Sequence, residues 1–463
     1  MSKTKLISEY YVRPKIEVHE SKRIHHLNPF DLKWLPFHNA QTGYLHSKPS
    51  NFTPSSYLKH LRLSLSQALV YFYPLAGRFV TVSNPHDQSC YVYVDCLKGP
   101  GVRLVHASAH DLSMDHVVSP NLDVPELVRE LFDMGETSIN HDGHTRALVS
   151  VQVTELKDGV FLGICGNHAV ADGTTFFHFQ RVWSHIFMGT FSKSVTLPLV
   201  KQPDFIQGRI FKLPYIDPSE YITGSTGEEP ELSRRFFQFS PQSLKQIKAM
   251  ANSDSRSRSS SYKTVSTFQS LIAFVWKCIT RVRNLNPDEP TTCAVPINLR
   301  QRFNPPLTND YFGNYAIKAT ASAKAGDLLG NSVGWAAALL QQAVAAQDDR
   351  TARDLILQAY KDGPDQVLPP VKIAGSSNVT VAGSTRFNLN ESEFGLGKLV
   401  AFRSGNVNKV DGKVNAYLGS DGDGSVDLDI CLAPNTMAAL LSDQEFMRFA
   451  SQHTGHFNLI SRI

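Results

Sequence analysis

The chain has 463 residues, and its 46 lysine and arginine side chains nearly balance 42 aspartate and glutamate side chains, for a formal net charge of +4. This balance disfavours a nucleic-acid binder that works by neutralising phosphates. Hydrophobic residues make up 42% and charged residues 19%, which is typical of a globular protein and excludes a disordered one. At about 150 residues per domain, the length allows two or three domains.

Neither a membrane-spanning nor a secretory segment is expected. The longest apolar runs, such as 159–165 and 271–276, are far shorter than the ~18 residues that cross a bilayer. The first 20 residues carry charges where a signal peptide needs an apolar stretch. The six cysteines are too sparse for a disulfide framework and include no CxxC pair. We therefore expect a reduced, cytoplasmic protein that binds no membrane.

The first half of the chain alternates helix and strand patterns. Thr53 and Pro54 form a helix start, and leucines at helical spacing follow until Tyr73-Pro74, where proline disfavours further helix. Apolar runs then predict strands, and one later run predicts a helix with a buried face. The strands are expected at 90–97, 102–109, 147–153 and 160–166, and the helix at 174–187.

The second half begins after a proline-rich stretch at about 192–231, which we interpret as a linker. The arginines of the serine-rich stretch 252–261 either grip an anionic ligand or nucleic acid, or lie in a solvated loop. Helices are expected at 267–283 and 331–345, and strands at 414–419 and 426–433. Because helices and strands are mixed throughout, the expected fold class is α/β.

The most informative local sequence is FLGICGNHAVADGTTFF, residues 161–177. A buried strand runs into a turn that carries His168, and Asp172 stands at the mouth of the next helix. Strand ends are where α/β sheets present reactive groups, and the ordinary near-neutral pKa of histidine suits a general base. From this motif alone, the alternative is a structural turn histidine beside a helix-capping aspartate.

Five segments follow one another along the chain: HLNPFDLKWLP, YPLAGR, HAVADG, VSTFQSLIAFVWKCITRVR and INLRQRFNPPLTNDYFGNY. Together they resemble the BAHD acyltransferases, the plant family of CoA-dependent acyltransferases, and HAVADG matches the HxxxD motif of that family. The resemblance implies a two-domain fold like that of chloramphenicol acetyltransferase, with a channel between the domains. The expected domains are 1–195, carrying HxxxD, and 231–463, joined by a linker at 196–230. The segment at about 380–404 is expected to pack with the first domain.

The same resemblance implies a mechanism. His168 would remove a proton from a hydroxyl or amine of a plant metabolite as that group attacks the thioester of acyl-CoA, without an acyl-enzyme. Asp172 would point away from the substrate and pair with Arg300, with Arg302 as the alternative. Acyl-CoA is expected as a co-substrate, with no bound cofactor or metal, and the protein is expected to be a monomer.

Further site residues are carried over from the family. Lys263, Ser266 and Thr267 are expected to bind CoA, and His38 to line the acceptor pocket. The hydroxyl of Ser384 is either an oxyanion donor or a plain loop serine. Arg386 either contacts an acceptor carboxylate or forms an ion pair with one of the glutamates Glu391 and Glu393.

Two departures from the family stand out. The DFGWG signature reads EFGLG here, with Glu393, Phe394, Gly395 and Gly397 as the expected structural motif around the changed Leu396. YFGNY ends in tyrosine where malonyl-transferring members have cysteine, so a malonyl-CoA preference is not supported.

Alternatives to a transferase remain open in the sequence. A BAHD-like lyase would cleave a conjugated metabolite without CoA, and a non-catalytic binding protein would keep only the fold. The terminal Ser461-Arg462-Ile463 is a variant of the Ser-Lys-Leu peroxisomal address, which makes peroxisomal import the alternative location. The acyl donor, the acceptor and the acylated atom cannot be predicted from these motifs.

Overall fold

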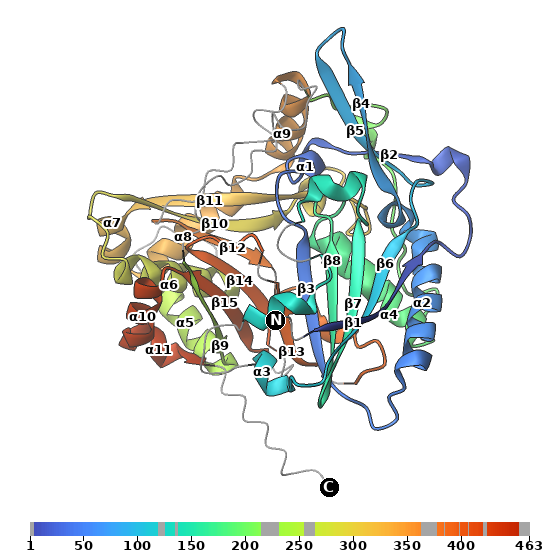
Figure 1. Ribbon diagram of the computed structural model, residues 1–463. Coiled ribbons are helices and arrows are strands. Elements are labelled where there is room, and N and C mark those ends of the chain that lie inside the picture. The colour runs from blue at the N-terminus through green and yellow to red at the C-terminus, as the bar shows by residue number, and fades with distance from the viewer. Residues whose placement is uncertain are drawn as a thin grey trace.

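Three β-sheets organise the chain in the computed structural model, which describes residues 4–118, 126–134, 138–213, 231–253, 264–362, 377–383, 385–397, 399–405, 407–419 and 424–452. The first sheet has six strands in the order β1-β6-β7-β8-β3-β13, and the second has seven in the order β11-β10-β12-β14-β15-β9-β16. They lie side by side, with the N-terminal half on the right of Figure 1 and the C-terminal half on the left. This mixture of helices and strands is the α/β class predicted from the sequence.

The first sheet is covered on one face by the helices α2 (Pro54–Tyr71) and α4 (Gly173–Phe187), which share a hydrophobic core with it. Every residue of β7 and β8 is buried, which explains why both read as apolar runs in the sequence. The strands are β1 (Lys5–Val12), β3 (Ala40–Ser47), β6 (Val102–Ala109), β7 (Val149–Leu156), β8 (Gly159–Gly166) and β13 (Leu399–Ser404).

The second sheet packs one face against a layer of helices and forms its own core with them. Its strands are β9 (Ser233–Phe239), β10 (Pro290–Asn298), β11 (Ala316–Lys324), β12 (Val379–Gly383), β14 (Lys413–Leu418), β15 (Val426–Leu432) and β16 (Ala450–Gln452). Besides α9, which is described below, the helices of this half are α5 (Pro241–Ser253), α6 (Thr267–Val282), α7 (Ala325–Gly330), α8 (Val333–Ala345), α10 (Pro434–Ser442) and α11 (Gln444–Phe449).

A small third sheet, ordered β2-β5-β4, projects at the top of Figure 1. It consists of β2 (Ile24–His26), β4 (Arg78–Asn84) and β5 (Ser89–Asp95). The remaining helices are short or peripheral: α1 (Pro29–Leu32), α3 (Met114–Val118) and α9 (Asp349–Asp362). Of these, α1 matters most for the site, because it begins the segment that leads to Trp34 and His38.

One strand from the second half of the chain joins the first sheet. β13 comes from the C-terminal half but pairs antiparallel with β3, so that Phe402 lies opposite Tyr44. The segment predicted at about 380–404 to pack with the first domain is therefore too long at its start, because β12 pairs with β10 and β14 inside the second sheet. The domain limits at 195 and 231 stay predictions.

The linker is held at two points within the described residues. Leu199 forms a parallel bridge with Tyr311, and Leu213 forms an antiparallel bridge with Cys90. The rest of the linker, from 214 to 230, lies outside the described residues. The chain thus runs from the first domain along the loop that follows β10 before it enters the second domain.

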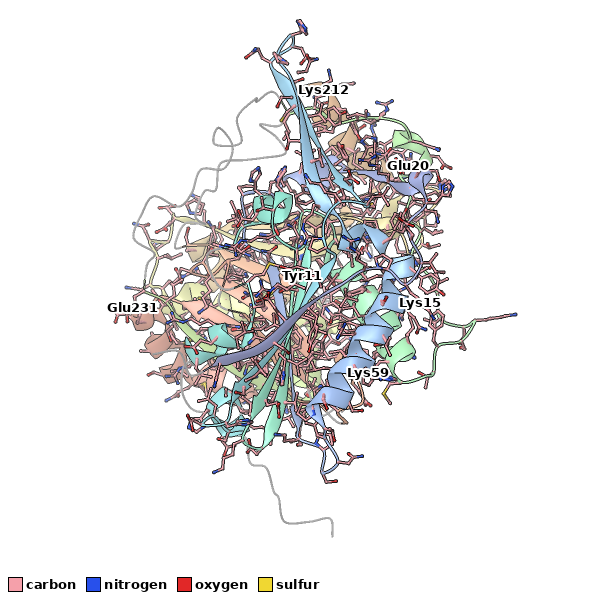
Figure 2. All side chains as sticks on the ribbon, turned by 45° about the vertical axis from the view of Figure 1, so that its right-hand side comes forward. Tyr11, Lys15, Glu20, Lys59, Lys212 and Glu231 are labelled. Atoms are coloured by element: carbon pink, nitrogen blue, oxygen red, sulfur yellow. The ribbon has the colours of Figure 1, made fainter. Side chains whose placement is uncertain are left out.

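Exposed charges of both signs are spread over several elements of the surface, as Lys15, Lys59, Lys212, Glu20 and Glu231 illustrate (Figure 2). All six cysteines are free and buried. Within the described ranges, no helix is both long and apolar enough to cross a membrane.

One glycine makes a close approach possible between the first sheet and the segment that covers it. Gly163 of β8 lies so near the chain at Leu131 that an added Cβ would stand 2.3 Å from the Leu131 carbonyl oxygen. We predict that Gly163→Ala lowers the free energy of unfolding by about 1–3 kcal/mol, because a backbone segment must shift to accept the methyl group.

Denaturant unfolding measures this change. Gly330→Ala is the matched control, since its Cβ would meet nothing within 4 Å, and it should change stability by less than about 0.5 kcal/mol. Equal stability of the two variants would contradict the packing described here.

Candidate active site

His168 sits in the turn between β8 and α4, and side-chain amides hold the backbone of this turn. The His168 N–H donates to Asn140 Oδ1 at 2.7 Å, and Asn167 Nδ2 donates to the Asn140 carbonyl at 2.6 Å. Asn167 Oδ1 accepts from the Ala169 N–H at 3.0 Å. Asn140 itself is fully buried. The position of the histidine backbone is therefore set by hydrogen bonds that do not involve its ring.

The imidazole ring of His168 is half-buried and stacks on Trp34, with ring centroids 3.8 Å apart and an interplanar angle of 21°. Its Nδ1 atom is buried and has no hydrogen-bond partner among the described residues. Enclosure by protein lowers the pKa of His168 to about 4, although the charge of Asp172 opposes this shift. The ring is therefore neutral at pH 7 and able to accept a proton.

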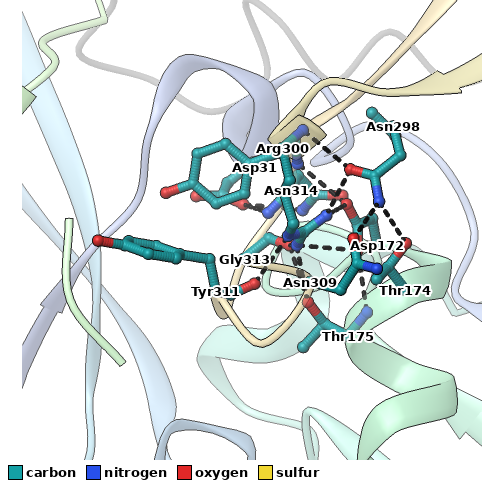
Figure 3. A network of polar contacts seen from close by, with 12 residues as sticks. Asp31, Asp172, Thr174, Thr175, Asn298, Arg300, Asn309, Tyr311, Gly313 and Asn314 are labelled. Atoms are coloured by element: carbon teal, nitrogen blue, oxygen red, sulfur yellow. Dashed lines mark hydrogen bonds and ion pairs between the residues drawn. The ribbon is translucent and has the colours of Figure 1, made fainter. Parts of the chain in front are cut away.

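Asp172 forms a buried ion pair with Arg300 (Figure 3). Arg300 Nη1 donates to Asp172 Oδ2 at 2.7 Å and Nη2 donates to Oδ1 at 3.2 Å, so the contact is bidentate. The two residues are 1% and 0% exposed, respectively. Burial alone would raise the pKa of the Asp172 carboxyl, but the guanidinium charge and its hydrogen bonds hold that pKa below its usual range. The carboxylate is therefore ionised.

The other contacts of the Asp172 carboxylate are with backbone N–H groups. It caps α4 by accepting from the Thr175 N–H at 3.0 Å, and it accepts from the Tyr315 N–H at 3.0 Å. Within the described residues, no hydrogen bond joins this carboxylate to the His168 ring. Asp172 thus fixes the end of the histidine turn rather than acting on the imidazole directly.

Arg300 also forms hydrogen bonds with the loop that precedes β11. Its Nε donates to the Tyr311 carbonyl and its Nη2 donates to the Gly313 carbonyl, both at 2.9 Å. Nη2 also donates to Thr175 Oγ1 at 3.1 Å. Since Arg300 lies in the second half of the chain and α4 in the first, this side chain ties the two halves together at the base of the histidine turn. Of the two arginines predicted as partners of Asp172, it is Arg300 rather than Arg302 that makes the contact.

A second buried carboxylate, Asp31, joins the N-terminal motif to the same loop. Asp31 Oδ1 accepts from Asn314 N at 2.9 Å and Asn314 Nδ2 at 2.8 Å, and Asp31 Oδ2 accepts from the Asn28 N–H at 2.7 Å. Asn314 Nδ2 also donates to the His168 carbonyl at 2.9 Å. Burial raises the pKa of Asp31 to about 7 despite these donors. Two motifs far apart in sequence therefore meet beside the histidine.

His38 lies on the loop that Asn140 binds. Its Nδ1 donates to the Ser138 carbonyl at 3.1 Å, and its ring is half-buried. Asn140 Nδ2 donates to the Trp34 carbonyl at 2.8 Å and to the His38 carbonyl at 3.4 Å. One buried asparagine therefore connects the His168 turn to the loop expected to line the acceptor pocket.

The residues predicted to bind CoA lie at the start of α6. Ser266 is the exposed N-cap of this helix, and its hydroxyl accepts from the Gln269 N–H at 3.2 Å. Thr267 is the first helical residue. Lys263 lies outside the described residues, as does Ser384 of the predicted oxyanion pocket.

Arg386 is exposed, and the residue after it, Phe387, stacks on Phe177 of α4 with ring centroids 4.2 Å apart. Glu391 is one of the two alternative partners of Arg386. Its Oε2 atom lies 3.8 Å from Nη1 of Arg181. This segment therefore runs over the exposed side of the helix that Asp172 caps.

The EFGLG segment packs against the same helix. Phe394 is fully buried and meets Trp183 of α4 with ring centroids 4.7 Å apart. Gly395 and Gly397 have φ of 70° and 82°, a left-handed conformation that glycine adopts without strain. Glu393 is half-buried, and its carbonyl accepts from the Leu396 N–H at 3.0 Å. This loop supports α4 from outside the reaction centre.

Two residues of the site were missed in the sequence. Trp34 stands inside the N-terminal motif, and its proximity to His168 follows only from the fold. Asn140 carries no sequence signal, because its role comes from a turn that is distant in the chain. Within the described residues, no group of three or more histidine, cysteine, aspartate or glutamate side chains could hold a metal ion.

Comparison with known proteins gives consistent matches over nearly the whole chain. Residues 3–447 match the model of a family described as the Transferase family. An uncharacterized acetyltransferase of Arabidopsis thaliana is 33% identical over 458 residues, which cover 96% of this chain and 99% of the relative. The BAHD acyltransferase DCR of the same plant is 33% identical over 460 residues, which cover 96% of this chain and 92% of the relative.

Two solved structures share the fold. Vinorine synthase superimposes with a TM-score of 0.72 at 19% identity, covering 97% of this chain and 99% of that one. TRI101 of F. graminearum, complexed with coenzyme A and T-2 mycotoxin, has a TM-score of 0.74 at 18% identity, covering 92% of this chain and 99% of that one. The two-domain α/β fold class predicted from the sequence is thus confirmed.

The buried ion pair generates a stability prediction. Asp172→Ala should lower the free energy of unfolding by about 3–5 kcal/mol, because it leaves the Arg300 guanidinium buried without its counter-charge. Asp288→Ala is the matched control: it removes an ion pair with Lys324 at 2.9 Å, whose side chains are 85% and 60% exposed, respectively. That variant should lose no more than about 1 kcal/mol. Urea unfolding of both variants measures these changes. Similar losses of unfolding free energy in the two variants would contradict the structural role of Asp172.

Proposed function

The chain belongs to the Transferase family of BAHD acyltransferases, and we propose that it moves an acyl group from an acyl-CoA thioester to a hydroxyl or amine of a plant metabolite. The single observation that carries this proposal is the neutral, half-buried His168, in a turn whose end is fixed by the Asp172–Arg300 ion pair. A neutral imidazole held by its backbone is suited to take a proton from an attacking nucleophile.

The proposed step is a direct transfer. The acceptor oxygen or nitrogen attacks the thioester carbonyl while His168 Nε2 takes its proton, which gives a tetrahedral intermediate. That intermediate collapses as the carbon–sulfur bond breaks, and the departing CoA thiolate takes the proton from the imidazolium. The products are an ester or amide and free CoA thiol, and no acyl group becomes attached to the protein.

The ion pair has a positioning role in this mechanism. Asp172 ends the histidine turn and starts α4, and Arg300 joins this point to the loop at Tyr311–Gly313. Because a general base needs hydrogen-bond distance to the proton it removes, a small shift of the turn is enough to slow the reaction. Asp172 thus acts through the position of His168.

Acyl-CoA is a co-substrate in this proposal, and no resident cofactor is required. We propose that it is bound near the exposed N-terminus of α6, by Ser266, Thr267 and Lys263. TRI101, which shares the fold, is complexed with coenzyme A, and this supports a co-substrate of this kind. His38, Ser384 and Arg386 are proposed to line the acceptor side, with Ser384 as a donor to the oxyanion.

The lyase alternative has no support in the comparisons. The two relatives from Arabidopsis thaliana carry the names of an acetyltransferase and an acyltransferase. The two chemistries differ in one product, because a lyase would release no CoA thiol. A thiol-specific dye therefore separates them in a single assay with a panel of acyl-CoAs and a plant metabolite extract.

The location and oligomeric state are further proposals. We propose a cytoplasmic location, because all six cysteines are free and buried. We also propose that the protein is a monomer. The peroxisome-like tripeptide at 461–463 lies outside the described residues. A fluorescent fusion that leaves the C-terminus free would distinguish the cytoplasm from peroxisomes.

Removing the imidazole should abolish most of the activity. We predict that His168→Ala lowers kcat by about 10²–10⁴-fold, the usual loss on removing a general base. The assay follows acceptor-dependent release of CoA thiol and the mass of the product. The fold should persist, because the turn is held through the His168 backbone, and circular dichroism checks this. A variant with near-wild-type turnover would show that His168 is not the base.

The pH dependence follows from the lowered pKa of His168. Since only the neutral ring accepts a proton, and its pKa is about 4, kcat/KM should stay near its maximum down to about pH 5.5 and fall below that. The acceptor should be an alcohol that does not titrate in this range, and folding should be monitored at each pH. An acid limb with its midpoint at or above the ordinary histidine pKa would contradict the buried environment of the ring.

A further inference from the structure

The direction in which the His168 ring points depends on what packs against it. Its Nδ1 atom is buried and has no hydrogen-bond partner among the described residues. The hydrogen bonds that Asn140 and Asn314 form with this residue are made with its backbone N–H and its carbonyl. These bonds set the backbone, so the orientation of the imidazole has to come from another contact.

Trp34 supplies a contact of this kind. The centroids of the indole and the His168 imidazole are 3.8 Å apart and their planes differ by 21°, so the two rings are nearly parallel and touch face to face. Among the aromatic rings of the described part of the chain, that of Trp34 alone packs on His168. Turning the imidazole about its Cβ–Cγ bond would drive its edge into the indole, because packed atoms leave no room for the overlap. The stack therefore restricts the rotation of the ring.

The indole is itself held in place by its neighbours. The Trp34 carbonyl accepts from Asn140 Nδ2 at 2.8 Å, and the Trp34 N–H donates to the Asp31 carbonyl at 3.1 Å. Phe37 meets the indole edge to face, with ring centroids 5.5 Å apart and an interplanar angle of 63°. The next residue in the chain, Leu35, is fully buried. Trp34 thus offers the histidine a fixed surface.

One buried amide sets the positions of both partners in the stack. Asn140 Oδ1 accepts from the His168 N–H at 2.7 Å, while Nδ2 of the same side chain donates to the Trp34 carbonyl. Asn140 is fully buried, so water does not compete for either bond. Because the two backbones bind opposite sides of a single amide group, the fold fixes the distance between the two rings.

An indole face acts differently on the two protonation states of the imidazole. The faces of the indole ring carry partial negative charge, which attracts a cation within about 6 Å of the ring centroid. His168 becomes such a cation when it removes the proton of the acceptor. Since enclosure keeps the ring neutral before that step, the attraction arises only as the proton moves. Interactions of this kind lower the barrier and raise kcat.

The charged groups near His168 act in both directions. Asp172 favours the protonated ring, as do the Asn314 side chain and the carbonyl of His168 itself, whereas Lys33 opposes protonation. Lys33 Nζ donates to the Ala316 carbonyl at 3.1 Å and lies 5.5 Å from the indole centroid. A nearby ammonium group makes it less favourable to charge the imidazole. An attractive surface in direct contact with the ring offsets this effect.

We propose that Trp34 is a positioning residue for the acyl transfer. Its indole face holds the imidazole of His168 in the orientation that accepts the proton, and it stabilises the imidazolium that forms. The inference rests on the proposed function and assigns to that reaction a residue outside the HxxxD motif.

The kinetic test exchanges the indole for side chains with and without an aromatic face. Trp34→Leu should lower the single-turnover rate about tenfold, the loss expected for a desolvated contact between a cation and an indole, with KM for both substrates changed less than about twofold. Trp34→Phe keeps an aromatic face and should retain at least about a third of the rate. Single-turnover conditions are used so that product release does not hide the step.

Trp335→Leu is the matched control. Trp335 is a half-buried residue of α8 that packs against the core of the second sheet, so the same exchange there should leave the rate unchanged. If Trp34→Leu does not fold, Trp34→Met takes its place, because methionine adapts to irregular apolar gaps. An equal loss of rate in Trp34→Phe and in the aliphatic variant would overturn the proposal, since the aromatic face would then have no role.

The stack is observed directly, without substrate, by NMR at neutral pH. In protein labelled with ¹³C at the Cε1 atoms of its 17 histidines, the signal missing from His168→Gln belongs to His168. The ring current of a stacked indole moves this signal upfield. The shift should be present in the wild type, in Trp34→Phe and in Trp335→Leu, and absent from Trp34→Leu. The other histidine signals report whether each variant keeps its fold. An identical His168 signal in the wild type and in Trp34→Leu would overturn the stack.

The two measurements separate this inference from the proposed function. If the wild type releases no thiol from any acyl-CoA, acyl transfer is refuted and the positioning role with it, while the NMR signal still shows whether the rings stack. If the wild type is active and a folded Trp34→Leu variant turns over at the same rate, acyl transfer stands and the role of Trp34 is wrong.

Discussion

The ion pair between Asp172 and Arg300 is the contact on which the site depends. It is fully enclosed, bidentate and formed across the two halves of the chain. The Asp172 carboxylate also accepts a hydrogen bond that caps α4, and the Arg300 guanidinium also donates hydrogen bonds to the loop before β11. A buried charge is unfavourable when it loses its partner, so neither residue tolerates movement of the other. Because the histidine turn ends at Asp172, the ion pair also fixes the position of this turn.

The chemistry of His168 comes from what surrounds it on three sides. Trp34 covers one face of the ring, Asn140 and Asn314 hold its backbone, and enclosure by protein lowers its pKa. β13 and the loop at Asn408 tie the second half of the chain to the same region. A neutral imidazole is therefore held where the two halves of the chain meet.

Local patterns in the sequence predict the elements with clear periodicity. The predicted bounds of α2, α4 and α6 agree closely with the structure, because caps and apolar stripes mark these helices in the sequence. β8 is predicted because its residues, all of them buried, form an apolar run. The pairing of β13 with β3 could not be predicted from local patterns, since no local signal selects a partner so distant in the chain. Arg300 was found through the family resemblance alone. Trp34 and Asn140 were missed because stacking and hydrogen bonding between distant loops appear only once the chain is folded.

A double-mutant cycle on the ion pair tests the central claim most directly. Asp172→Asn, Arg300→Gln and the double variant would be compared with the wild type by denaturant unfolding. If the pair holds the two halves together, each single variant is strongly destabilised and the second substitution adds little, with a coupling free energy of at least about 1 kcal/mol. Losses in the two single variants that simply add up in the double variant would contradict the account, because they would show that the two charges do not act on each other.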